Sequence, residues 1–302
     1  MFRESAYADI RSAAGAGRDV SVSQVVDTRA PFWRVLQGWF ADDEGAPPEV
    51  ASTLDIAAYS DTGEHARLRE GLGTLVQQYA EGLPVRRGVR VARLDWSGQG
   101  VTLETTHGVI HARAAIVSVS TAVLSREIIA FAPRLPTRTL AAIHALPLST
   151  YEKVGMRLDG RTLVDEPAWV LSVGDDVSVA FEVQPVDQPR VIAYLSGPQL
   201  AAQPPDALWT LARDRLVAVF GTHAAAQVVA WRATRWNSDE LIGGSYSYAV
   251  PGEAAARGVL AEPLDDRVFF AGEACSRTAY GTLHGAFLSG RAAAERVARV
   301  LA

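Results

Sequence analysis

The chain has 302 residues, of which 48% are hydrophobic and 21% charged, and its formal net charge is −5. This length allows more than one folding unit, and the composition is that of a soluble globular protein. Because Lys and Arg do not cluster along the sequence, nucleic acid is disfavoured as a partner.

Cysteine usage and targeting features narrow the class further. The single cysteine, Cys275, cannot form an intramolecular disulfide or a thiolate cluster, and the six histidines are scattered along the chain, so we expect no metal site. The N-terminus lacks the apolar centre of a signal peptide, and no apolar run reaches the roughly 20 residues that span a bilayer. We therefore expect no membrane association and a cytoplasmic location.

Helical patterns dominate the start of the chain. Residues 1–45 look helical, because apolar side chains recur at helical spacing within 31–40, and the Ala-Pro-Pro sequence at 46–48 breaks the pattern. A second helix is predicted at 71–82, opened by glycines and closed by a glycine.

A β-rich block follows. Alternating apolar and polar residues at 89–96, 101–106 and 109–112, separated by turns that contain glycine, predict a three-stranded meander. The continuous apolar run at 114–120 is typical of a strand buried on both faces, as in a parallel sheet.

The second half of the chain mixes strands and helices. Residues 148–200 contain the alternating segments KVGMRL, SVAFEV and RVIAYLSG, and a helix is predicted around 206–220. RVFFAGE at 267–273 is another buried strand, and small or apolar residues at helical spacing predict a final helix from residue 283 to the C-terminus. The pattern indicates a parallel α/β layer, formed by the runs at 114–120 and 267–302, with a more antiparallel α+β segment inserted between them.

The stretch RVFFAGEACSRTAYGTLHGAFLSG at 267–290 has the features of a polar-ligand site. A buried strand ends at Gly272-Glu273, and a helix opens near Gly281-Thr282-Leu283. A carboxylate at the end of a strand can accept hydrogen bonds from sugar-type hydroxyls, and glycine permits close approach of the backbone. The N-terminus of the helix favours an electron-rich or anionic group.

This stretch resembles the C-terminal flavin-binding signature of the flavin-containing amine oxidase family, which includes monoamine oxidases, polyamine oxidases and flavin-dependent histone lysine demethylases. The resemblance implies FAD as the cofactor, with Glu273 holding the ribityl hydroxyls and Thr282 and Leu283 offering backbone N–H groups to the pyrimidine edge of the flavin. The other residues of this stretch counted as cofactor-binding are Gly272, Gly281 and Ala286.

Two further segments match the family in its own order. In TYEKVGM, Lys153 stands where the family carries an active-site lysine that holds a water against flavin N5. In TRWNSDELIGGSYSYAVPG, Trp236 corresponds to a tryptophan packed beside the isoalloxazine. The resemblance therefore implies that Trp236 also binds the cofactor. Tyr246 falls on one of the two aromatic positions that sandwich the amine in monoamine oxidases, and Thr282 on the other. Ser245 stands where some monoamine oxidases bond a cysteine to FAD, so the resemblance implies non-covalent FAD.

The dinucleotide-binding part of the family pattern is incomplete. Residues 88–124 resemble the meander and the strand after it, and Val91 matches the position whose backbone contacts adenine. The family's G-x-G-x-x-G, which receives the FAD pyrophosphate after a buried strand, has no counterpart in the sequence. We therefore expect an N-terminally truncated chain, and a partner chain that supplies the Rossmann unit is one explanation.

The expected fold class is α/β plus α+β, an incomplete FAD-binding domain, Rossmann-like and of the glutathione-reductase type, with an inserted substrate domain of mixed or antiparallel sheet and helices. The expected segments are 1–64 for the helical part of the substrate domain, 65–145 for an FAD-domain segment with the meander, 146–252 for the substrate-domain sheet and helices, and 253–302 for the C-terminal FAD-domain segment.

The resemblance implies an FAD-dependent oxidoreductase that oxidises the C–N bond of a small-molecule amine. Hydride would pass from the α-carbon to the flavin, the imine would hydrolyse, and O2 would reoxidise the flavin with release of H2O2. Lys153, Trp236 and Tyr246 are the expected catalytic residues. Two other interpretations stay open. One is a non-catalytic fragment or one subunit of a split flavoenzyme, and the other is a related flavin desaturase or protoporphyrinogen-oxidase-like protein.

Overall fold

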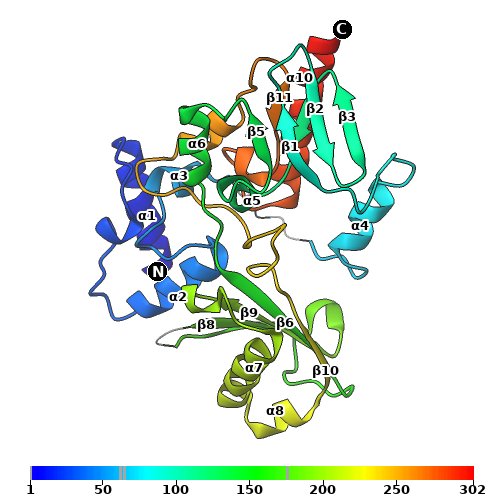
Figure 1. The fold of residues 1–302 in the computed structure, drawn as a ribbon. Helices are drawn as coiled ribbons and strands as arrows, with labels where there is room; N and C mark the ends of the chain where they lie inside the picture. Colours follow the sequence, from blue (N-terminus) through cyan, green and yellow to red (C-terminus); the bar gives the residue numbers. More distant parts are fainter. Residues whose placement is uncertain (1, 61–62, 64–65, 175–176) are drawn as a thin grey trace.

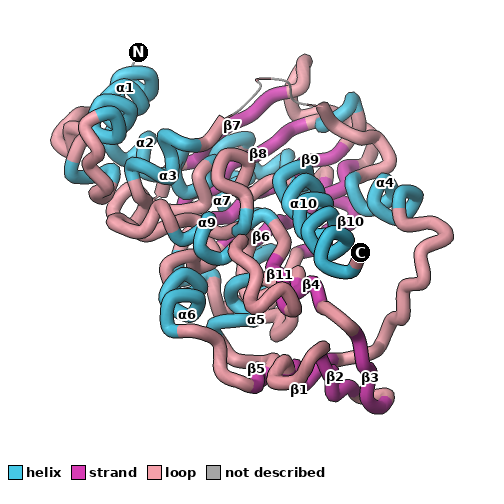
Figure 2. Tube along the Cα trace, turned by 90° about the horizontal axis from the view of Figure 1, so that it is seen from above, coloured by secondary structure: helices cyan, strands magenta, loops and turns pink. Residues whose placement is uncertain are grey.

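The computed structural model describes residues 2–60, 63, 66–174 and 177–302, and most of their core lies in three apolar clusters (Figure 1). One cluster joins the N-terminal helices, one lies against a five-stranded antiparallel sheet, and one connects the smaller sheets with the helices around them. Seen from above, the N-terminal helices and the β-meander lie at opposite ends of the molecule (Figure 2).

The N-terminal region is helical, as predicted, but it is interrupted. Its elements are α1 (Phe2–Gly15), η1 (Val22–Gln24), α2 (Trp33–Asp43) and α3 (Thr53–Ala58). Ile10, Leu36 and Phe40 lie in their shared core. The helix α3 begins where it does because the Ser52 side chain accepts a hydrogen bond from the Asp55 backbone N–H at 3.0 Å.

The predicted meander is confirmed. The strands β1 (Val91–Asp95), β2 (Val101–Thr105) and β3 (Gly108–Ala112) pair antiparallel in sequence order, and α4 (Leu72–Tyr79) precedes them. A short strand that the sequence pattern did not reveal, β5 (Ala130–Ala132), adds to β1 in parallel. The resulting sheet has the order β3-β2-β1-β5.

The two buried apolar runs far apart in sequence do pair in parallel, as β4 (Ala115–Val117) and β11 (Val268–Phe270). The first is shorter than predicted: its pairing ends at Val117, opposite Phe270, and residues 118–120 lead into a helix that the Ser120 hydroxyl caps by accepting from the Val123 N–H at 3.2 Å. The helices and turns around this pair are α5 (Thr121–Ser125), α6 (Thr137–His144), α9 (Ala256–Leu260), η4 (Glu273–Cys275) and α10 (Leu283–Leu301). That this pair belongs to an incomplete Rossmann-like domain stays a prediction.

The middle of the chain forms an antiparallel sheet in the order β10-β6-β9-β8-β7. Its strands are β6 (Tyr151–Leu158), β7 (Ala168–Ser172), β8 (Ser178–Val183), β9 (Arg190–Ser196) and β10 (Val228–Ala233). Three of the five were predicted from alternation, whereas β7 and β10 were not. Its connections contain η2 (Pro185–Asp187), η3 (Pro198–Leu200), α7 (Pro205–Phe220) and α8 (Thr222–Ala226).

The two faces of this sheet have different roles. Val154 and Met156 on β6 share a core with Leu208, Ala212 and Leu216 of α7, which covers one face (Figure 1). The helix α2 contacts β8 and β9 on the opposite face of the sheet. Because side chains alternate along a strand, that other face carries the odd-numbered residues of β6.

One surface is apolar. Exposed apolar side chains on α4 and in the first turns of α10 form it, namely Leu72, Leu75, Val76, Tyr79, Leu283, Phe287 and Leu288. The rings of Tyr79 and Phe287 meet edge to face at 5.5 Å, which joins the two helices into one patch. Among the described residues, no helix is long and apolar enough to cross a membrane.

Candidate active site

Lys153 lies on the face of the five-stranded sheet opposite α7, between aromatic rings. Its partner across the ladder is Tyr194 on β9, and its Nζ stands 4.5 Å from the centre of that ring and 5.5 Å from the Trp236 ring. Burial lowers the pKa of the Lys153 ammonium, the nearby Arg67 charge lowers it further, and the carboxylates of Asp42 and Glu182 act in the opposite direction. The ammonium is therefore less strongly favoured here than on a surface lysine.

A cavity of about 290 Å³ opens beside Lys153. Aromatic rings and carboxylates dominate its wall, which comprises Asp42, Asp43, Glu44, Tyr59, Tyr151, Lys153, Trp169, Tyr194, Tyr246, Tyr280, Gly281 and Thr282. We call this space the aromatic cavity. Electron-rich ring faces and carboxylates both attract cations, so the cavity suits an organic cation of small size.

The carboxyl group of Asp42, at the end of α2, is held inside this wall. The Tyr151 hydroxyl donates to Asp42 Oδ1, and the Tyr246 hydroxyl donates to the Asp42 carbonyl at 2.9 Å. Burial raises the pKa of Asp42 to about 6, against the hydrogen bond from Tyr151, which lowers it. Glu44, which accepts from the Tyr7 hydroxyl at 2.5 Å, has a pKa raised by burial to about 7. Neither carboxyl was singled out from the sequence.

Tyr246 fits only because two glycines lie against its ring. A Cβ on Gly45 would stand 2.3 Å from Tyr246 Cε2, and a Cβ on Gly281 would stand 3.1 Å from Tyr246 Cδ2. Both glycines also have positive φ, 72° and 67°, which disfavours other residues. Tyr246 thereby packs between the end of α2 and the loop that precedes α10.

Trp236 is positioned by a buried carboxylate. Glu152, 2% exposed, accepts from the Trp236 N–H at 3.2 Å, the Asn237 N–H at 2.9 Å and the Asn237 side-chain amide at 3.0 Å, and also from the Thr234 hydroxyl. These bonds fix the turn that follows β10. Trp236 lines a second cavity of about 520 Å³, and Lys153 borders both cavities.

The Glu273 carboxylate lies at the end of β11, between two loops. Its Oε1 accepts from the Ser247 N–H at 3.0 Å, and its Oε2 accepts from the Ser247 hydroxyl at 2.9 Å and the Gly281 N–H at 2.7 Å. The Cys275 thiol lies in the same turn, and burial, with the Glu273 charge as a second cause, raises its pKa to about 12. At neutral pH that thiol is protonated, which disfavours a role as nucleophile.

The loop before α10 closes tightly onto the helix. Thr282 begins the helix, because its Oγ accepts from the Gly285 N–H at 2.9 Å while its hydroxyl donates to the Ala279 carbonyl at 2.6 Å. A Cβ on Gly285 would stand only 1.8 Å from that carbonyl oxygen. The N–H groups at the very start of α10, near Leu283, have no intrahelical acceptor and point out of the helix end.

These residues fit the flavin end of FAD. Gly272 has φ 136°, and a Cβ there would meet open space, so a ligand can approach the backbone beside Glu273. Each oxygen of a carboxylate can accept two hydrogen bonds, so Oε1 of Glu273 retains an acceptor position for a ligand hydroxyl. The start of α10 offers N–H groups near Thr282 and Leu283. A glycine-rich pyrophosphate cradle is not found in the 302-residue sequence.

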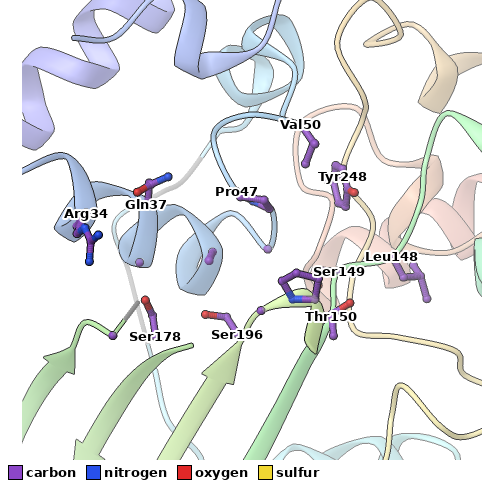
Figure 3. Close-up of a pocket in the computed structure, with 16 residues that line it drawn as sticks. Arg34, Gln37, Pro47, Val50, Leu148, Ser149, Thr150, Ser178, Ser196 and Tyr248 are labelled. Atoms are coloured by element: carbon purple, nitrogen blue, oxygen red, sulfur yellow. The ribbon is translucent and has the colours of Figure 1, made fainter. Parts of the chain in front are cut away.

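A further cavity of about 480 Å³ lies on the other side of the end of α2 (Figure 3). Figure 3 shows Arg34 and Gln37 of α2 above Ser178 and Ser196, with Tyr248 toward the opposite end. Consecutive residues separate this cavity from the aromatic cavity, because Ala41 lines the first and Asp42 the second.

The predicted site residues lie in four places. Lys153, Tyr246, Thr282 and Gly281 share the aromatic cavity. Trp236 lies in the adjoining cavity, and Gly272 and Glu273 lie behind the loop, with Glu273 bonded to the Gly281 N–H. Three lie elsewhere, namely Val91 at the start of β1 and Leu283 and Ala286 in the first turn of α10.

Sequence reasoning missed Asp42 and Glu152. An acidic residue at the end of a helix and a glutamate inside an alternating strand look like ordinary solvated groups. One signal was available for Glu152, because a glutamate next to Lys153 at a buried strand position needs hydrogen-bond donors. Within the described residues, no group of three or more His, Cys, Asp and Glu is arranged to hold a metal ion.

Comparison with known families identifies one match along most of the chain. The profile of the family described as "Flavin containing amine oxidoreductase" matches residues 12–298. Among curated relatives, lysine-specific histone demethylase 1 homolog 2 of Arabidopsis thaliana is 28% identical over 95% of this chain, and polyamine oxidase 4 of Oryza sativa subsp. japonica is 29% identical over 90%. The chain spans 42% and 57%, respectively, of the lengths of these two relatives.

Solved structures show the same fold. Cyclohexylamine oxidase from Brevibacterium oxydans IH-35A superposes with a TM-score of 0.75 at 23% identity, covering 97% of this chain and 68% of that one. A redesigned putrescine oxidase superposes with a TM-score of 0.77 at 18% identity, covering 95% of this chain and 69% of that one.

Proposed function

Because the chain belongs to the flavin-containing amine oxidoreductase family, we propose that it oxidises the C–N bond of a small-molecule amine, with non-covalently held FAD and with O2 as the final acceptor. Family membership implies a flavin, which supplies the acceptor for a hydride from the α-carbon of the amine. The observation that carries the proposal is the aromatic cavity, where Lys153, Tyr246 and a buried carboxyl group meet.

The aromatic cavity recognises the substrate by charge. Amines are mostly protonated at neutral pH, and the aromatic rings in the wall of the cavity attract a cation. Asp42 adds a negative charge once the pH exceeds about 6, because its pKa is raised to that value. Oxidation needs the neutral amine, so a group that accepts a proton from the bound cation is also required, and we assign this role to the Asp42 carboxylate because it lies in the cavity wall.

Lys153 serves to hold a water molecule. It is the only lysine in the 302-residue sequence. All other residues counted as Lys or Arg are arginines. A guanidinium would be larger and permanently charged, whereas an ammonium with a lowered pKa offers a compact donor that can also release its proton. Its position between the aromatic cavity and the cavity lined by Trp236 suits a water at the boundary of the two.

The cofactor residues follow from the same geometry. Glu273 would accept a hydrogen bond from a ribityl hydroxyl through Oε1, and the N–H groups at Thr282 and Leu283 would face the pyrimidine edge. Ala286, in the first turn of α10, and Gly281 would border the same edge, and the backbone at Val91 would contact adenine. Ser245 cannot form a thioether, which supports a non-covalent cofactor.

The test is a screen of primary, secondary and poly-amines with the purified chain and added FAD, in which H2O2 is measured by a peroxidase-coupled assay. We expect peroxide from at least one amine class. Lys153→Met should slow the reaction of the reduced protein with O2 by at least about tenfold, while leaving anaerobic reduction by the amine less affected. An unchanged rate with O2 would remove Lys153 from this role.

A second candidate function is that of a subunit that acts only with another polypeptide. The exposed apolar patch on α4 and α10 favours it, because a patch of this kind usually marks an interface. The partner would carry the G-x-G-x-x-G unit for the pyrophosphate. A chain that self-associates, binds the apolar dye ANS and takes up no FAD would support this function, and a monomer that takes up FAD would exclude it.

A further inference from the structure

Arg257 is fully buried, 0% exposed, and has a definite set of partners. Its Nε and Nη2 form a two-pronged ion pair with the Asp55 carboxylate at 2.7 and 2.8 Å, and its guanidinium stacks 3.7 Å from the Tyr280 ring centre. Asp55 belongs to α3 and Arg257 to α9, so the pair joins the N-terminal helices to the C-terminal region. Leaving such a charge without partners would be costly, so breaking this pair would be strongly destabilising.

The same guanidinium continues toward the C-terminal loop through Ser247. Arg257 Nη1 donates to Ser247 Oγ at 2.8 Å, and Nη2 donates to the Ser247 carbonyl at 3.2 Å. Ser247 in turn donates to the Glu273 carboxylate twice, through its N–H and its hydroxyl, at 3.0 and 2.9 Å. An unbroken line of hydrogen bonds thus runs from Asp55 to Glu273.

Arg257 sets the direction of this line. A hydroxyl has one proton, and a guanidinium can only donate. Because Arg257 fills an acceptor position of Ser247 Oγ, the hydroxyl proton is left to point at Glu273. Together with the Gly281 N–H, this saturates Oε2 of Glu273 and leaves the free acceptor position on Oε1.

We propose that Arg257 is a positioning residue for the cofactor site, which acts through Ser247 to orient the Glu273 carboxylate so that Oε1 meets a ligand hydroxyl. The inference rests on the proposed function for the identity of the ligand, since Glu273 is there the group that binds the ribityl chain. Asp55 connects this line of hydrogen bonds to α3. The N-terminal helices therefore help to shape the flavin-binding loop, although the loop belongs to the C-terminal region.

The test uses two serine variants that differ in one respect. Ser247→Ala removes the hydroxyl that joins Arg257 to Glu273 Oε2, and it keeps the backbone N–H bond to Oε1 and the Arg257–Asp55 pair. Ser149→Ala is the control, since Ser149 is also buried, at 3% exposed, and its hydroxyl has no hydrogen-bond partner among the described residues. The first readout is hydrogen exchange of the Gly281 amide, which donates to Glu273 Oε2 and reports its position without flavin. The second readout is the dissociation constant for FAD.

We expect Gly281 exchange to accelerate and the FAD dissociation constant to rise about tenfold in Ser247→Ala, the effect of losing one hydrogen bond to a charged group. Ser149→Ala should match the wild type in both. Wild-type exchange at Gly281 in Ser247→Ala, or equal acceleration in the control, would overturn the proposal. If Ser247→Ala accelerates exchange but the wild type binds no flavin, the positioning network stands and the proposed function fails.

Discussion

Lys153 is a cation that the fold keeps partly out of water, between Tyr194 and Trp236. The proposed chemistry needs an amine there, and the pKa of that amine is accessible because the chain has a single lysine. Reductive methylation with ¹³C-formaldehyde labels only Lys153 and the N-terminal amine, so each group gives its own NMR signal. Residue-level electrostatics of the cavity can therefore be measured directly.

We predict that the Lys153 signal titrates below the ordinary value of 10.5, since burial and Arg67 disfavour its charge. Replacing Asp42 with Asn should lower the pKa of Lys153 further, because the Asp42 carboxylate stabilises the ammonium. The ¹³C NMR titration of both proteins gives the comparison. A Lys153 pKa at or above the ordinary value would contradict the arrangement of charges described here.

Asp42 also makes a pH-dependent contribution to stability. Its pKa is raised by burial from 3.8 to about 6, so between these values the folded chain holds a proton that the unfolded chain has released. The stabilising contribution is complete below pH ~4 and is lost as the pH rises through ~6, at up to about 1.4 kcal/mol for each unit between the two pKa values. Asp42→Asn should lack this dependence.

Urea denaturation of wild type and Asp42→Asn at several pH values provides the measurement. The difference in free energy of unfolding, wild type minus variant, should decline from pH 4 to pH 6.5 and stay level above that range. A difference that rises with pH would mean that the Asp42 carboxyl favours its charged form in the folded state.

At the scale of elements, the loop before α10 depends on one glycine. Gly285→Ala would place Cβ 1.8 Å from the Ala279 carbonyl oxygen, which must then move and lose the Thr282 hydroxyl bond. We expect a loss of about 3 kcal/mol in the free energy of unfolding, the upper range for overpacking. Thermal or urea denaturation measures it.

Gly290→Ala, in the same helix, is the matched control because a Cβ there meets nothing within 4 Å. It should be neutral or stabilising by up to about 1 kcal/mol, since alanine favours the helix over glycine. Equal losses in both variants would show that the contact with Ala279 is not the limiting feature.

Sequence patterns revealed the elements in which apolar residues recur regularly. Alternation of apolar and polar residues predicted the meander and β6, and apolar residues at helical spacing over many residues predicted the final helix. The short strand β5 was missed because three residues span little more than one strand period, and the helices α6 and α9 were missed because five to eight residues span at most about two helical turns. The limits of β4 also shifted, because its partner strand β11 ends opposite Val117.

The candidate site was only partly predictable for the same reason. Motifs with fixed spacing pointed to Lys153 and Glu273, which lie 120 residues apart in sequence. Lys153 shares the aromatic cavity with the loop before α10, and Glu273 accepts a hydrogen bond from that loop at Gly281. Asp42, Glu152 and Arg257 act through contacts across distant segments, such as the bond from Arg257 to Asp55. No local pattern encodes such contacts, because they form only once the clusters have packed together.

At the scale of the whole molecule, three distant parts of the chain contribute to the wall of the aromatic cavity. The helix α2 contributes Asp42, the five-stranded sheet contributes Lys153, and the loop before α10 contributes Gly281. Glu273 joins the C-terminal loop to the segment that carries Tyr246, through its bonds to Ser247. The cavity therefore forms only when these parts of the chain have packed together.

The exposed apolar patch on α4 and α10 lies next to the start of α10, where the flavin ring would be held. An interface there would couple association to cofactor binding, because both would use the first turn of α10 near Leu283. Flavin binding is thus the property on which both candidate functions turn.

The most direct test is a titration of the purified chain with FAD, followed by quenching of flavin fluorescence, for the wild type and for Glu273→Gln. We predict saturable binding of one flavin per chain and weaker binding by the variant. Absence of saturable quenching, or equal affinity of the two proteins, would contradict a flavin site at the junction of β11 and α10.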